Sequence, residues 1–159
     1  MTYRLDSDMK QAYGFFSVVK PLPKKQHLPQ YIKKFGASHT HLAANKTKLV
    51  AWLVSNCHSS SAREAYVNEL KKHIDVDVYG RCGKNTCPHS KERDCMSFIE
   101  KDYKFYLSFE NSLSLDYITE KLFKVMKINV VPITFSWGQR FPLPVNSTID
   151  ALSYLNPKV

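Results

Sequence analysis

The residues best suited to bind a ligand follow a predicted buried strand, within residues 104–122. The apolar run at 105–109 is typical of a strand that is buried on both faces of a sheet. A polar loop comes next, and Asp116 is a suitable N-cap for a helix predicted over residues 117–127. Ligands of α/β sheets bind where strands end and helices begin, so this loop is a candidate site.

The first turns of that predicted helix present three polar side chains, Tyr117, Glu120 and Lys121. The N-terminus of a helix favours an anion through its dipole and its free N–H groups, and Lys121 adds positive charge. An ordinary amphipathic helix with its lysines in solvent is the alternative interpretation. In either case one apolar stripe faces the core: Ile118, Leu122, Val125 and Met126.

A second junction of the same kind follows the apolar residues 46–55. Ser61 and Glu64 have the spacing of a capping box, which predicts a helix start there. Arg63 then lies in the first turn, where the helix dipole disfavours a cation. A bound anion would explain Arg63, and an ion pair with Glu64 or a neighbouring carboxylate would explain it equally well.

The elements alternate along the chain, which predicts an α/β fold with a parallel sheet, right-handed crossovers and helices on both faces. Residues 1–45 are rich in proline and read as an extended lead-in with one short helix at 28–35. The further elements predicted after the second junction are a strand at 76–79, an irregular cysteine-bearing loop, strands at 104–109 and 129–134, and a last helix over 148–154.

Composition agrees with one folded domain that has an anionic ligand. A chain of 159 residues with 43% hydrophobic residues can bury a core. The net charge of +9 suits a negatively charged partner, although five lysines fall in the proline-interrupted lead-in and read as a solvated face. A nucleic-acid-binding domain is the rival class, but it predicts aromatic residues interleaved with basic ones on an exposed face, and most aromatics here lie in apolar runs.

The cysteines allow two interpretations. Cys82, Cys87 and Cys95, with His89 between them, have a spacing that matches no common structural zinc site. Disulfides within this loop, such as Cys82–Cys87 or Cys87–Cys95, fit a secreted protein. Cys57 ends a buried strand and reads as a small buried thiol.

Two triplets, Asn45-Lys46-Thr47 and Asn146-Ser147-Thr148, would accept N-linked glycans in a lumenal protein. No apolar run is long enough to span a bilayer, and no signal-like segment opens the chain.

A set of segments follows one recognisable pattern along the chain: residues 1–8, 50–57 with Arg63 and Tyr66, 76–83, 103–112 and 116–122. Together these segments resemble the α1,3-fucosyltransferase family. They occur in that family's order and spacing, and the likeness runs from residue 1 to about residue 133.

The resemblance implies an enzyme that transfers fucose from GDP-fucose to a GlcNAc hydroxyl of glycoprotein glycans, in α1,3 linkage and with inversion. It implies one Rossmann-like half of a GT-B architecture, with a lead-in at 1–45 and a GDP-fucose-binding domain at 46–159 that is truncated at its C-terminus. Fixed cations would stabilise the charge that grows on the departing diphosphate. The implied donor-binding roles are Arg63 and Lys121 on the diphosphate, Glu120 on the ribose, and Tyr117 and Asn111 lining the pocket.

The same resemblance places the general base in an acceptor half that precedes this chain, so no residue here is assigned that role and the catalytic residues stay unknown. It implies a lumenal Golgi protein whose membrane anchor belongs to the full-length form. No metal site is expected, and Mn²⁺ would enter only with the donor diphosphate. The cysteine-bearing loop and residues 148–152 look closer to members that act on the innermost GlcNAc of N-glycans. The alternative is an inactive donor half that binds only GDP or GDP-fucose.

The chain also departs from the family pattern at two places. Ser114 stands where relatives often have cysteine, and residues 134–138 replace a glycine-rich turn.

Overall fold

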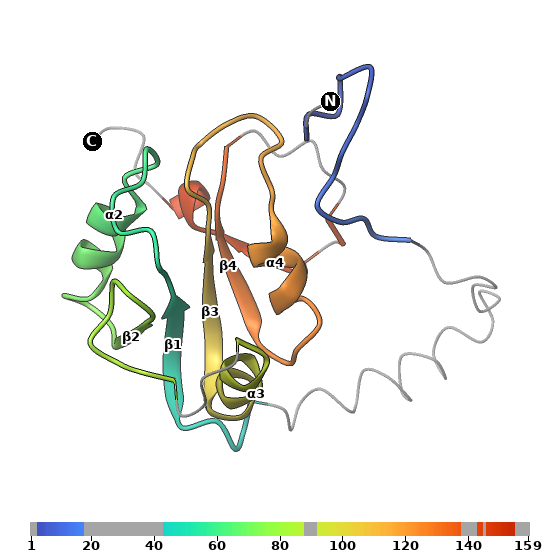
Figure 1. The fold of residues 1–159 in the computed structure, drawn as a ribbon. Coiled ribbons are helices and arrows are strands. Elements are labelled where there is room, and N and C mark those ends of the chain that lie inside the picture. Colours follow the sequence, from blue (N-terminus) through green and yellow to red (C-terminus); the bar gives the residue numbers. More distant parts are fainter. Residues whose placement is uncertain (1–2, 18–42, 88–91, 138–142, 145, 155–159) are drawn as a thin grey trace, which may run out of the picture.

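The computed structural model describes residues 3–17, 43–87, 92–137, 143–144 and 146–154. Helices and strands alternate through them, as Figure 1 shows. The elements in chain order are β1 (Lys48–Leu53), α2 (Arg63–Leu70), β2 (Val76–Tyr79), α3 (Glu92–Asp102), β3 (Tyr103–Phe109), α4 (Glu120–Val125), β4 (Val131–Phe135), β5 (Ile149–Asp150) and the 3₁₀ turn η2 (Ala151–Tyr154).

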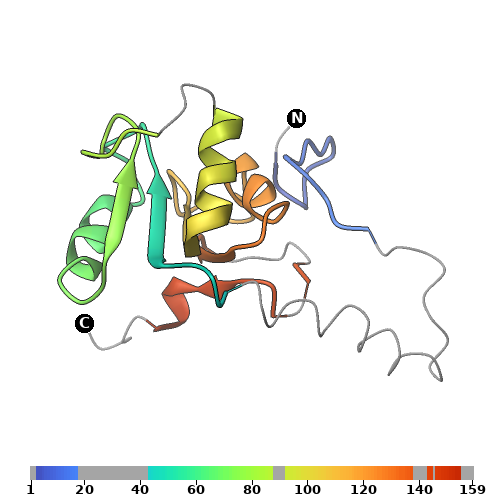
Figure 2. The same ribbon diagram turned by 90° about the horizontal axis from the view of Figure 1, so that it is seen from below.

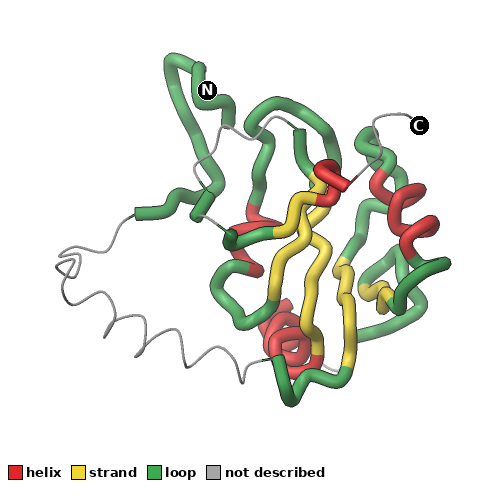
Figure 3. The backbone as a smooth tube through the Cα atoms, turned by 180° about the vertical axis from the view of Figure 1, so that it is seen from behind, coloured by secondary structure: helices red, strands yellow, loops and turns green. Residues whose placement is uncertain are grey.

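The strands form one sheet in the order β2-β1-β3-β4-β5, and every neighbouring pair is parallel. All carboxyl ends therefore lie at one edge of the sheet, which is the edge that binds ligands in α/β folds. Central strand β3 is buried from Tyr106 to Phe109, and the backbone trace in Figure 3 shows it between its neighbours. The predicted α/β fold with a Rossmann-like parallel sheet is confirmed.

The helices cover both faces of this sheet. Side chains alternate along β1, so Val50 and Trp52 lie on one face and Ala51 on the other. The first face packs against α2 and η2 through Val67 and Ala151. The opposite face packs against α3 and α4, and the view from below in Figure 2 shows these two helices together on that side. Two apolar cores, one on each face, hold the sheet in place.

Helix α3 lies where the sequence predicts an irregular loop, so that prediction is wrong. Two of its residues one turn apart, Cys95 and Ile99, are buried against the sheet. The apolar residues at 95, 96, 98 and 99 do recur at helical spacing, but they cover little more than one turn between charged residues. The helix predicted over 148–154 is confirmed only at its end, where residues 151–154 form the 3₁₀ helix η2, whereas Ile149 and Asp150 form the short strand β5. The helix predicted at 28–35 lies outside the described residues.

The four cysteines form two disulfides, Cys57–Cys82 and Cys87–Cys95. The second pair was predicted, whereas the free Cys57 thiol and the Cys82–Cys87 bond are wrong. The Cys82 N–H donates to the Val54 carbonyl at 3.2 Å, which brings the loop after β2 alongside the end of β1 and sets Cys82 opposite Cys57. Among the described residues no helix is long and apolar enough to cross a membrane.

Candidate functional site

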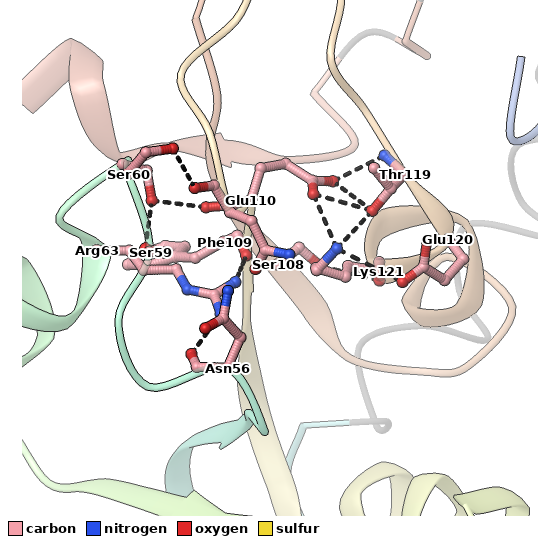
Figure 4. Close-up of polar contacts among 12 residues, drawn as sticks. Asn56, Ser59, Ser60, Arg63, Ser108, Phe109, Glu110, Thr119, Glu120 and Lys121 are labelled. Carbon is pink, nitrogen blue, oxygen red and sulfur yellow. Dashed lines mark hydrogen bonds and ion pairs between the residues drawn. The ribbon is translucent and has the colours of Figure 1, made fainter. Parts of the chain in front are cut away.

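The centre of the candidate site is Glu110, which directly follows the last residue of β3. This carboxylate is buried and accepts hydrogen bonds from the Thr119 N–H at 2.7 Å and from the Thr119 hydroxyl. Lys121 Nζ approaches it at 3.0 Å, as Figure 4 shows. Glu110 therefore closes the loop 110–119 and sets the position of Lys121. Glu110 is not among the donor-site residues predicted from the sequence, although a carboxylate placed directly after a buried strand is a signal for such a role.

Helix α4 starts three residues later than predicted, at Glu120, with Thr119 as the preceding residue. Asp116 is not its N-cap, because Asp116 has a left-handed backbone with φ of 60° and its carboxylate accepts the Leu5 N–H at 3.2 Å. The physical reason is that Glu110 takes the Thr119 N–H, which an N-cap would otherwise serve. Of the predicted apolar stripe, Leu122 and Val125 are buried within α4, Ile118 is buried just before it, and Met126 is partly buried just after it.

Arg63 opens helix α2 and is 2% exposed. Its Nη1 donates to the Phe109 carbonyl at 2.6 Å and its Nη2 to the Asn56 carbonyl at 3.0 Å, so it joins the ends of β3 and β1. Its Nε contacts Glu64 at 3.2 Å, which is the ion pair that the sequence left open. These contacts leave part of the donor capacity of the guanidinium uncommitted among the described residues.

The serine loop before α2 is not a capping box. The Ser61 hydroxyl donates to the Glu110 carbonyl at 2.8 Å, whereas Glu64 accepts from the Ser59 hydroxyl at 2.8 Å. Ala62 precedes the helix with φ of 54°, so no side chain caps it. The predicted pairing of Ser61 with Glu64 fails because the end of β3 offers Ser61 a buried carbonyl.

Asn111 receives this serine loop on its backbone. Its carbonyl accepts the Ser61 N–H at 3.1 Å and the Ser60 hydroxyl at 3.0 Å. Its side-chain oxygen Oδ1 is buried and has no hydrogen-bond partner among the described residues. A buried acceptor without a partner costs about 1–3 kcal/mol, so a ligand donor at this atom would be favourable.

Tyr117 lies just before α4 and packs its ring against Tyr3, with centroids 4.8 Å apart. Burial raises the Tyr117 pKa, and the negative charges of Glu110 and Glu120 contribute to the rise. Burial would also raise the Glu120 pKa, but the Lys121 charge and hydrogen bonds to the carboxylate outweigh it and leave that pKa below its usual value. Near neutral pH the site thus holds a neutral phenol beside an ionised carboxylate.

The two predicted cations come from helices on opposite faces of the sheet, yet they meet the same short segment of chain. Arg63 binds the Phe109 carbonyl and Lys121 binds the Glu110 carboxylate, as Figure 4 shows from either side of β3. Two cavities of about 470 and 380 Å³ flank β2, and none of the five predicted donor-site residues lines either of them. The candidate site is therefore the carboxyl edge of β3, where these largely buried polar groups converge.

The part of the chain that the structure describes contains no cluster of metal-binding side chains. No group of three or more His, Cys, Asp or Glu side chains there could hold an ion. All four cysteines are engaged in disulfides, so they offer no thiolate to zinc. Entry of Mn²⁺ with a diphosphate stays a prediction.

Known proteins resemble this chain along most of its length. Alpha-(1,3)-fucosyltransferase C of Drosophila melanogaster is 37% identical over 98% of this chain and 38% of its own length. Glycoprotein 3-alpha-L-fucosyltransferase A of the same fly is 41% identical over 83% of this chain and 24% of its own length. The bovine 3-galactosyl-N-acetylglucosaminide 4-alpha-L-fucosyltransferase FUT3 is 44% identical over 99% of this chain and 40% of its own length.

A solved structure described as "Crystal Structure of alpha1,3-Fucosyltransferase" has 25% identity and a TM-score of 0.48, and the match covers 65% of this chain and 31% of that one. The chain spans at most 40% of the length of the three relatives above. The sequence model of glycosyltransferase family 10 (fucosyltransferase), C-terminal region, matches residues 43–159. This match covers more than half of the chain, and the protein therefore belongs to glycosyltransferase family 10, the fucosyltransferases.

Proposed function

We propose that this chain binds GDP-fucose at the carboxyl edge of β3 and supplies the donor side of fucosyl transfer to a glycan hydroxyl. The supporting observation is the convergence of Arg63 and Lys121 on the adjacent residues Phe109 and Glu110. Fixed positive charges stabilise a bound diphosphate. The guanidinium of Arg63 can donate two parallel hydrogen bonds to a phosphate, and the ammonium of Lys121 adds a compact positive charge.

Each of the remaining donor-site residues has a role that fits its position. Glu120 is partly exposed and ionised at neutral pH, so it can accept hydrogen bonds from the ribose hydroxyls. Tyr117 is a neutral hydrogen-bond donor beside it. Asn111 Oδ1 is an acceptor without a partner, which suits a hydroxyl or an N–H of the donor. Together they provide complementary groups for a nucleotide sugar.

Binding would require Lys121 to exchange partners. Its Nζ lies 3.0 Å from Glu110 and 3.5 Å from Glu120, and the side chain is a quarter exposed. Glu110 keeps its hydrogen bonds to Thr119 when Lys121 turns toward a phosphate, so the carboxylate is never left unpaired. A lysine is suited to such a move because its ammonium rotates freely on a flexible stem.

In the proposed reaction, the acceptor hydroxyl attacks the anomeric carbon of fucose on the face opposite the diphosphate. The bond from that carbon to the phosphate oxygen breaks, and GDP leaves with the electron pair. Arg63 and Lys121 stabilise the charge that develops on the leaving group. The proton of the acceptor goes to a general base that no residue of this chain is assigned to supply.

The finer assignment is an α1,3 linkage to a GlcNAc of glycoprotein N-glycans, made in the Golgi lumen. The name of the fly relative, glycoprotein 3-alpha-L-fucosyltransferase A, supports a glycoprotein acceptor. The bovine relative is named for a 3-galactosyl-N-acetylglucosaminide, which is the competing acceptor class. The alternative function is binding of GDP or GDP-fucose without turnover.

Calorimetry with GDP tests the donor site directly. Lys121→Ala should weaken binding by about 1.5–3 kcal/mol, because it removes a charge-assisted contact to phosphate. Lys127→Ala is the matched control, since Lys127 is an exposed lysine just beyond the same helix. Absence of GDP binding, or equal affinity in both variants, would overturn the proposal.

A separate assay distinguishes the enzyme from the binding module. The chain is incubated with GDP-fucose and either an N-glycan glycopeptide or a galactosyl-N-acetylglucosamine acceptor, and the fucosylated product is measured by mass spectrometry. Product from this chain alone would locate the general base within it. GDP binding without product would favour the donor-binding alternative.

A further inference from the structure

We infer that Asn45 is an N-linked glycosylation site, a modification that the proposed fucosyl transfer does not involve. Asn45-Lys46-Thr47 has the acceptor pattern Asn-X-Thr with no proline at its centre. The triplet begins on the last residue of a turn at 43–45 and ends just before Lys48, the first residue of β1.

Lys46 determines how the triplet is presented. This residue is buried, and its Nζ donates to the carbonyls of Glu100 at 2.5 Å and Tyr103 at 2.9 Å, and also to that of Asn129. Successive side chains of a segment that enters a strand point to opposite sides. An inward Lys46 therefore directs Asn45 and Thr47 outward, and both are exposed. The acceptor amide and the hydroxyl that the pattern requires are both available.

The position of Asn45 is also compatible with the proposed donor site. Asn45 precedes the amino end of β1, whereas Asn56, which contacts Arg63, follows its carboxyl end, as the course of β1 in Figure 1 shows. A strand of six residues is about 20 Å long. A glycan on Asn45 would begin at the opposite edge of the sheet and would leave the nucleotide site open.

The disulfides independently support passage of the chain through the secretory pathway. All four cysteines of the chain are paired, as Cys57–Cys82 and Cys87–Cys95. Stable structural disulfides are characteristic of proteins that pass through an oxidising compartment. Asn-linked glycans are attached to secreted proteins, so both modifications require the same secretory route. This step rests on the lumenal location proposed above, but it does not depend on donor binding.

The chemical step needs a lipid pyrophosphate-linked oligosaccharide as co-reactant. The amide nitrogen of Asn45 forms a bond to the anomeric carbon of the first sugar, and the bond between that carbon and the phosphate oxygen breaks. The lipid pyrophosphate leaves with the electron pair. The amide nitrogen gives up one proton to a base of the transferring enzyme.

The test expresses the chain behind a cleavable secretory signal peptide in eukaryotic cells and isolates it from the secretory fraction. Peptide-N-glycosidase digestion and peptide mass spectrometry should find Asn45 occupied. Asn45→Gln and Thr47→Ala should each remove one glycan, the latter with the acceptor amide intact. Asn129 is the internal control, since it is exposed but followed by two valines, and it should stay unmodified.

Recovery of Asn45 as an unmodified amide, from protein whose Cys57–Cys82 bond is formed, would overturn the inference. That bond shows that the molecule has reached the oxidising compartment. The GDP affinity of Asn45→Gln should equal that of the wild type, and a loss would contradict the placement of the glycan away from the donor site. GDP binding by the wild type is measured alongside, so failure of the donor proposal is seen separately.

Discussion

The two edges of the sheet each contain a buried basic residue, but the two residues are used differently. At the amino edge, Lys46 donates to three backbone carbonyls, which use all the donors of an ammonium group. At the carboxyl edge, Arg63 donates to two carbonyls and to Glu64, and its remaining N–H donors have no partner within the described ranges. Burial lowers the Lys46 pKa, against a smaller opposing effect of Glu100.

The polar groups around these two residues extend the contrast. Tyr103, the first residue of β3, donates its hydroxyl to Asp77 within β2 and shares a hydrogen bond with Tyr79 at the end of β2. Lys48 pairs with Asp77 at 3.2 Å. At the carboxyl edge, Asn111 Oδ1 lacks a partner among the described residues. A self-satisfied network stabilises the fold, whereas unsatisfied groups at an open edge are suited to a ligand.

The largest expected losses of stability come from removing the two disulfides. Comparing these two removals tests whether the carboxyl edge depends on the Cys57–Cys82 bond. Cys57–Cys82 closes 25 residues and Cys87–Cys95 closes 8. From loop entropy, replacing each pair by serine should lower the free energy of unfolding by about 3.5 and 2.5 kcal/mol, respectively. Chemical denaturation of both double variants measures these losses.

Only removal of the Cys57–Cys82 disulfide should also weaken GDP binding. Cys57 follows Asn56, whose carbonyl holds Arg63, so loss of the bond loosens a support of the proposed phosphate site. Cys87→Ser/Cys95→Ser serves as the matched control, because it removes a disulfide without touching Asn56. Equal GDP affinities in the two folded double variants would show that the tie does not position Arg63.

Lys46→Met is the next largest change and acts at the amino edge. It preserves side-chain length but leaves the carbonyls of Glu100, Tyr103 and Asn129 without their donor. We expect a loss of about 3 kcal/mol in the free energy of unfolding, with the GDP affinity of the folded fraction unchanged. Urea denaturation measures the first quantity and calorimetry the second. Lys72→Ala, at an exposed surface position, should change the stability by less than about 0.5 kcal/mol.

Substitution of two carboxylates at the carboxyl edge, Glu110 and Glu120, should affect stability and GDP binding separately. Glu110→Gln weakens a buried acceptor of Thr119 and Lys121, so we expect a loss of about 2 kcal/mol in stability. Glu120→Gln changes a half-exposed residue and should leave stability within about 0.5 kcal/mol while reducing GDP affinity. Thermal unfolding and calorimetry on both variants measure the two properties. The reverse pattern would assign the ligand role to Glu110.

Sequence reasoning succeeded where a residue's environment follows from its neighbours along the chain. The apolar runs of β1 and β3 predict buried parallel strands because both faces of a central strand are covered. The start of α4 was misplaced because Glu110, nine residues away, takes the Thr119 N–H. The same kind of distant contact draws Ser61 to the end of β3.

The candidate site shows the same division. Arg63 and Lys121 could be selected from their places near helix starts, but their convergence on Phe109 and Glu110 depends on the parallel register of the sheet. The Cys57–Cys82 pairing likewise needs the backbone bond between Cys82 and Val54, which no local pattern specifies.

The smallest expected effect is a pH dependence that compares buried tyrosines at the two edges. Burial, the hydrogen bond to Asp77 and the contact with Tyr79 raise the Tyr103 pKa far above its usual value. Above about pH 10 the unfolded chain loses the tyrosine proton while folded Tyr103 keeps it. The unfolded state then binds fewer protons, so stability falls as pH rises. Tyr117 at the carboxyl edge also has a raised pKa, from burial and nearby carboxylates.

Tyr103→Phe should therefore flatten the decline in unfolding free energy between about pH 9 and 11, since its hydroxyl no longer titrates. Urea denaturation at a series of pH values measures this slope. Tyr117→Phe is the matched comparison and should flatten it less, because Tyr117 is only partly buried and Tyr103 is fully enclosed. An unchanged or steeper decline in Tyr103→Phe would mean that the contacts with Asp77 and Tyr79 do not hold the tyrosine neutral, and the contrast between the two edges would then rest on Lys46 alone.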